Sequence, residues 1–134
     1  MRRLRQFLTG WSDYFMTVAE AVLPHIGMYR AARWVAERHY VDGLHGPGAK
    51  EHVLARIYEL AGDTRRAEEL YKKAVELRFD FADYHIFLGN FLARRKRMHE
   101  AIGALESARP FVQDQGTLGF IEANISKLQA YDQK

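Results

Sequence analysis

The side chains best able to do chemistry in this chain are its six histidines and 17 acidic residues, and there is no cysteine. The histidines are His25, His39, His45, His52, His85 and His99. No two of them lie four residues apart on one expected helix, which is the spacing that lets two imidazoles bind zinc. Without cysteine, thiolate metal sites, disulfides and cysteine nucleophiles are excluded. The sequence predicts no metal site.

The acidic residues and glycines do not form a catalytic pattern either. Glu68, Glu69 and Glu76 share one helix with Lys72 and Lys73, which indicates charge pairing on a solvated face. The glycine cluster at 43–48 is not followed by the lysine and hydroxyl residue of a phosphate-binding loop. We therefore expect a protein that is not an enzyme, with no catalytic residue and no cofactor.

Four consecutive cations occupy residues 94–97. Such a run attracts phosphates, but it falls at the end of an expected helix, where cations also offset the helix dipole. No aromatic side chains alternate with it, and the formal net charge of the chain is only +3. A solvated basic turn is favoured over a nucleic-acid site.

The elements that carry these residues are all expected to be helices. Apolar residues recur at steps of three and four over residues 4–23, and Pro24 should end that helix. A second helix is expected over 25–40, before a loop at 44–48. No segment alternates apolar and polar residues long enough for a strand. The predicted fold class is all-α.

The length of 134 residues suits one domain and leaves no room for separate cofactor and substrate lobes. The basic start of the chain is followed by Ser12, Asp13 and Glu20, so no signal peptide is expected, and no apolar run is long enough to span a membrane. We expect a single domain over 1–134 in the cytoplasm.

Residues 48–115 contain an internal repeat with a period of 34 residues. At this offset, small residues coincide with small ones and large apolar residues with large apolar ones. The pairs are Ala55 with Gly89, Ala67 with Ala101, Ala74 with Ala108, Leu54 with Leu88, Tyr58 with Leu92 and Tyr71 with Leu105. The physical basis is a helical hairpin, because alanines allow two helices to approach and larger residues fill the space beside them.

On these residues, together with the turn Gly62-Asp63 and Leu77, the segment resembles two tetratricopeptide repeats at 48–81 and 82–115. Lys96-Arg97 replaces the glycine and aspartate of the turn in the second repeat. The resemblance implies a helical hairpin stack that binds a protein or peptide segment. A polar-faced capping helix is expected over 116–134, with apolar residues at Leu118, Ile121, Ile125 and Leu128, and a helix pair or degenerate repeat over 1–46.

In this family the first helices of successive hairpins line a concave groove, and the resemblance places seven residues there. They are His52, Arg56, Glu59, Asp83, Ile86, Asn90 and Arg94. His52 stands where chaperone-binding members carry a lysine, so a chaperone tail is not the expected ligand. The implied function is a non-catalytic adaptor or scaffold.

The apolar stripe of the first helix offers an alternative. Its width suggests docking onto another copy, a larger partner or a membrane surface through residues 1–22. The expected docking face comprises Arg2, Arg3, Arg5, Trp11, Tyr14 and Phe15. Under this hypothesis the chain is a small peripheral subunit of a membrane-associated complex, although the same stripe would also serve as internal core.

Overall fold

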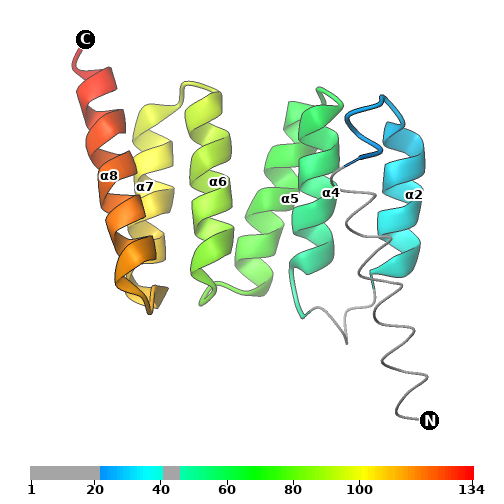
Figure 1. The fold of residues 1–134 in the computed structure, drawn as a ribbon, viewed down its shortest axis with the longest axis horizontal. Coiled ribbons are helices and arrows are strands. Elements are labelled where there is room, and N and C mark those ends of the chain that lie inside the picture. The colour runs from blue at the N-terminus through cyan, green and yellow to red at the C-terminus, as the bar shows by residue number, and fades with distance from the viewer. Residues whose placement is uncertain (1–21, 41–45) are drawn as a thin grey trace. The chain divides into compact units, whose positions relative to one another are not determined.

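The computed structural model of the chain describes residues 22–40 and 46–134. All regular structure in these two ranges is helical, and the fold class predicted from the sequence is confirmed (Figure 1). The elements are α2 (Tyr29–His39), α4 (Ala49–Leu60), α5 (Thr64–Leu77), α6 (Ala82–Arg94), α7 (Met98–Ala108), the short 3-10 helix η1 (Arg109–Phe111) and α8 (Gln115–Asp132).

The chain divides into two compact units, residues 1–74 and 75–134, and the boundary falls within α5. The expected organisation as a single domain over 1–134 stays a prediction. No helix within 22–40 or 46–134 has the length and apolar character that crossing a membrane requires.

The first unit is built around a buried apolar cluster that joins α2 and α4. The cluster comprises Ala32, Ala36, Val53, Leu54 and Ile57, with Leu23, Tyr40 and Leu70 packed against it. The two alanines of α2 are fully buried, so α4 can approach the backbone of α2 closely. Leu70 comes from α5, which therefore packs on the same core.

The helix expected over 25–40 begins later than predicted, at Tyr29. Residues 22–27 form turns around the buried Pro24, in which Gly27 has a φ of 78° and its N–H donates to the carbonyl of Pro24. Only glycine adopts that φ without steric cost, so the turn extends past the proline before the helix can start. The helix expected over 4–23 lies almost entirely outside the described residues.

The turn between α4 and α5 has the expected chemistry. Gly62 adopts a left-handed φ of 85°, and the side chain of Asp63 accepts a hydrogen bond of 3.2 Å from the backbone N–H of Arg66. The glycine ends one helix and the aspartate caps the next.

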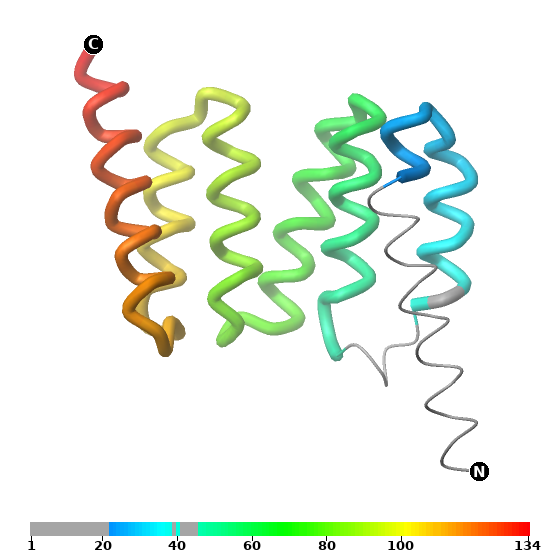
Figure 2. The backbone as a smooth tube through the Cα atoms, in the orientation of Figure 1, coloured from blue at the N-terminus to red at the C-terminus, as the bar shows by residue number. Residues whose placement is uncertain are grey.

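The second unit repeats this hairpin in α6 and α7, which Figure 2 follows through the turn at 95–97. At the offset of 34, the start of α5 at Thr64 falls on the start of α7 at Met98. Lys96 takes the place of Gly62 and adopts a left-handed φ of 60°. Arg97 takes the place of Asp63 and provides no side-chain cap. The backbone of the turn is therefore retained without the residues that favour it.

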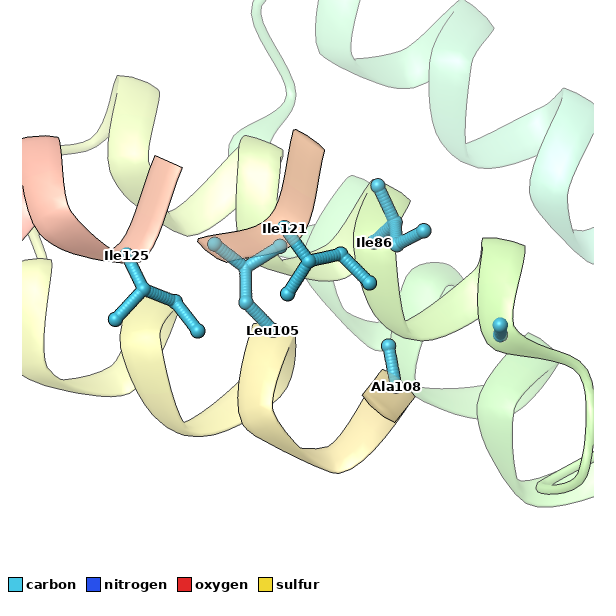
Figure 3. Close-up of a cluster of buried hydrophobic side chains, with 6 residues drawn as sticks. Ile86, Leu105, Ala108, Ile121 and Ile125 are labelled. Carbon is cyan, nitrogen blue, oxygen red and sulfur yellow. The ribbon is translucent and has the colours of Figure 1, made fainter. Parts of the chain in front are cut away.

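The core of the second unit joins α6, α7 and α8 (Figure 3). Its buried members are Ala82, Ile86, Leu105, Ala108, Ile121 and Ile125. The capping helix expected over 116–134 is present as α8, and its start is capped by Asp114, whose carboxylate accepts a hydrogen bond of 2.7 Å from the N–H of Thr117. Ile121 and Ile125 form the buried face of α8, as the apolar stripe predicted.

Candidate partner-binding surfaces

The first candidate surface is a row of polar side chains on α4. His52, Arg56 and Glu59 lie one helical turn apart and all three are partly exposed. Val53, Leu54 and Ile57 of the same helix are buried. Since residues four or three apart share a helix face, the row lies beside the buried face and remains accessible along α4. We call these three residues the α4 row.

Tyr71 of α5 fixes the position of one member of the row. Its hydroxyl donates a hydrogen bond of 2.9 Å to Oε2 of Glu59, and its ring centroid lies 6.0 Å from that of His52. Tyr71 is 1% exposed, so the hydroxyl is anchored from within the core. The sequence predicted Tyr71 only as a core residue. A buried tyrosine needs a hydrogen-bond partner for its hydroxyl, and this requirement could have indicated a polar neighbour such as Glu59.

The charge of the α4 row resides on Arg56 and Glu59. Burial of the His52 imidazole, together with the positive charge of Arg56, lowers its pKa to about 4. His52 is therefore neutral at pH 7. The row presents a neutral ring, a cation and an anion in sequence along one helix face.

The residues expected on α6 divide into two groups. Asp83 and Arg94 are exposed and Asn90 is partly exposed, so these three remain available to a partner. Ile86 is only 7% exposed and belongs to the core cluster of the second unit, so the expectation of an outward position does not hold for it. The apolar side chain gains more from burial than from lining a polar surface.

The basic run at 94–97 is partly engaged within the protein. The guanidinium of Arg95 lies 5.6 Å from the ring centroid of Phe91. Nε of Arg97 donates a hydrogen bond of 2.7 Å to Glu100. These contacts fit the solvated basic turn expected from the sequence.

Two further expectations concern metals and the N-terminal docking face. Within the described parts of the chain, no group of three or more histidine and acidic side chains is placed to hold a metal ion. The docking-face residues lie outside the described residues and stay a prediction. They are Arg2, Arg3, Arg5, Trp11, Tyr14 and Phe15.

The two hairpins, with small residues buried at equivalent positions, define a helical-repeat protein. Residues 52–83 match the family model of the tetratricopeptide repeat, which confirms the family predicted from the sequence. The match covers most of the first hairpin, and the second follows it at the same period. This family is generally non-enzymatic and its repeats mediate protein–protein interaction. No curated protein matches the chain.

Proposed function

We propose that the chain is a non-catalytic adaptor that binds a segment of a partner protein along the polar face of α4, the first helix of its first repeat. The observation that carries the proposal is the α4 row, in which Tyr71 holds the Glu59 carboxylate by a hydrogen bond of 2.9 Å. A polar group held in place before binding loses little freedom when a partner arrives, so it favours recognition. The family match supports the same class of function.

The charges of the row indicate the chemistry of the partner segment. Arg56 offers a planar guanidinium that pairs with a carboxylate through two hydrogen bonds. Glu59 is an acceptor for a backbone N–H or a cationic side chain, and the neutral His52 offers a flat ring with no charge to repel either. We therefore propose a segment with an acidic side chain placed opposite Arg56. Asp83 and Arg94, exposed on α6 of the second unit, stay a separate expectation from the sequence.

The test is co-purification of the tagged full-length chain from its native host, with the bound proteins quantified by mass spectrometry. We expect the partner to be lost on Arg56→Glu, because the charge that pairs with the acidic side chain is reversed. Arg65→Glu is the matched control, because Arg65 is 90% exposed on α5 and lies outside the row. Equal capture by both variants and the parent would contradict the proposal. Arg94→Glu tests the contribution of α6 separately.

The same experiment separates the alternative hypothesis of a peripheral subunit attached through its N-terminus. That hypothesis predicts that deletion of residues 1–22 abolishes capture while Arg56→Glu leaves it unchanged. Circular dichroism of each variant checks that its helices are intact. We propose a cytoplasmic location under both hypotheses, and attachment to a membrane only under the alternative.

A further inference from the structure

The second unit carries a surface depression of about 340 Å³ on the side where α6 and α8 begin. It is bounded by the loop before α6, the first turn of α6, the segment after η1 and the first turn of α8. The lining residues that matter here are Arg78, Asp80, Phe81, Asp83, Phe111 and Asp114. None of the residues of the α4 row belongs to it.

One wall of the depression is aromatic and held in place. The ring of Phe111 stacks on that of His85 at 5.9 Å, and Phe79 packs edge-on against Phe111 at 6.0 Å. Nε2 of the buried His85 donates a hydrogen bond of 2.6 Å to the carbonyl of Phe79. This bond ties the loop before α6 to the helix itself. Phe79 is nevertheless 66% exposed, a large apolar side chain beside the depression.

The rim of the depression is acidic. Asp80, Asp83 and Asp114 carry three negative charges against the single positive charge of Arg78. Hydrogen bonds from Thr117 lower the pKa of the Asp114 carboxyl below its usual value, so this carboxylate stays ionised at neutral pH and below. An aromatic wall next to excess negative charge favours a cation, which is attracted both by the carboxylates and by the ring faces.

Arg78 shows which side chain this chemistry accommodates. Its guanidinium lies 4.5 Å from the ring centroid of Phe81, and its Nε lies 3.8 Å from Oδ1 of Asp80. An arginine of the chain itself is therefore seated on the ring and beside a carboxylate of the rim. Asp83 and Asp114, which line the same depression as Phe111, are the carboxylates left to attract a second cation from outside.

We propose that this depression is a second interaction surface, which binds a basic segment of a partner protein. An arginine or lysine of the segment lies between the carboxylates and the aromatic wall, and a neighbouring apolar residue of the segment covers Phe79. The surface goes beyond the function proposed above, because its net charge is opposite to that of Arg56 and its residues belong to the second unit alone. The excess negative charge of the rim favours a cationic partner over an anionic one such as nucleic acid.

The test is a nuclear magnetic resonance titration of the labelled full-length chain with the peptide acetyl-Gly-Arg-Leu-Arg-Gly-amide. The control peptide carries glutamate in place of both arginines. We expect shifts centred on the backbone of residues 78–83 and 111–117 with the arginine peptide and none with the glutamate peptide. Binding should weaken on raising the ionic strength from about 0.05 M to about 0.5 M, since the attraction between exposed charges is screened.

Three variants locate the site. Asp83→Asn is expected to weaken binding about two- to fivefold, the range for an exposed ion pair. Glu106→Gln, at an exposed position of α7 outside the depression, is the matched control and should leave affinity unchanged. Arg78→Ala should instead strengthen binding about two- to fivefold, because it removes the competing cation from Phe81 and Asp80. A variant damaged only in its folding would not gain affinity.

Several results would overturn the proposal. They are equal shifts with both peptides, equal affinities of the Asp83→Asn and Glu106→Gln variants, and weaker binding by Arg78→Ala. Light scattering of the parent provides a further test, because self-association lost on Phe79→Ala would assign the surface to a second copy of this chain. The comparison of the two peptides on the parent protein needs no variant, so the result does not depend on how any substitution folds. Failure of the α4 row test would leave this result unaffected.

Discussion

Replacement of Gly89 by alanine should destabilise the second hairpin although alanine is the better helix former. A Cβ built on Gly89 would lie 2.9 Å from Cγ of Leu105, 3.0 Å from its Cδ2 and 3.2 Å from the carbonyl oxygen of Ala101. Optimal contact between carbon atoms is about 3.5–4.0 Å, so α6 and α7 would have to move apart or Leu105 would have to leave its position. Leu105 is 1% exposed and belongs to the buried core of the second unit, so a shift of its side chain would disturb its neighbours there.

The size of the effect follows from two opposing contributions. Overpacking a close helix contact costs about 1–3 kcal/mol, and the change from glycine to alanine inside a helix returns about 1 kcal/mol. We expect Gly89→Ala to lower the free energy of unfolding by about 1 kcal/mol. Gly103 is the matched control, because it lies in α7 with no atom within 4 Å of a built Cβ. Gly103→Ala should raise the free energy of unfolding by about 0.5–1 kcal/mol.

The assay is equilibrium unfolding in urea, followed by far-ultraviolet circular dichroism. The informative quantity is the difference between the two variants, in which the helix-propensity contribution cancels and the steric contribution of about 1–3 kcal/mol remains. A second measurement uses the Leu105→Ala background, where the obstructing side chain is absent and Gly89→Ala should become close to neutral. If Gly89→Ala and Gly103→Ala are equally stable, the close approach of α6 to α7 described here is incorrect.

Three further predictions concern the repeat turns, the histidine of the α4 row and the hairpin register. Lys96→Gly should raise the free energy of unfolding by about 1 kcal/mol and Gly62→Ala should lower it by a similar amount, because both positions have a left-handed φ. Urea titrations measure both changes. Changes of the same sign would contradict the left-handed conformation of the two turns. The pKa of His52 is 6.5 in the unfolded chain and about 4 in the folded protein, so the unfolded chain binds more protons between these two pH values. The contribution of His52 to the free energy of unfolding is therefore fully present above pH 6.5. It declines by at most about 3 kcal/mol as the pH falls to 4. A magnetic resonance titration of the imidazole measures this pKa, and His52→Gln should flatten the pH dependence of unfolding; an ordinary value near 6.5 would refute the burial argument. Ala67→Leu and Ala101→Leu should each cost about 1–3 kcal/mol, because both alanines are fully buried, and variants that melt like the parent would show the register to be wrong.

The helical hairpins could be predicted from the sequence because their physical requirement is visible in residue size. Two helices that touch need small residues at fixed positions, so Ala67 and Ala101 identified the period of 34, and both are fully buried. The same period predicted where α5 and α7 begin. Tyr71 and Leu105, paired by this period, are each 1% exposed.

The repeat period does not predict which side chains of the candidate surfaces are exposed or which contacts they make. His52 and Ile86 share one repeat position, but the first is a partly exposed polar ring and the second joins the core. The repeat period of 34 residues predicts on which face of a helix a residue lies. The type of side chain and its neighbours in the fold determine whether other residues cover it. The hydrogen bond from Tyr71 to Glu59 and the acidic depression beside Phe111 arise from residues far apart in sequence. They became visible only once the helices were placed.

The unequal starts of α5 and α7 affect how the protein opens locally. Asp63 satisfies one backbone N–H at the start of α5, while Arg97 cannot accept a hydrogen bond with its side chain and provides no such cap at the start of α7. The first turn of α7 therefore costs less free energy to unwind than the first turn of α5. Neighbouring repeats unfold as nearly separate cooperative units. Among the amides at the starts of α5 and α7, we therefore expect those that follow Arg97 to exchange earliest with solvent. An absent cap thus gives the second hairpin a built-in point at which partial unfolding begins.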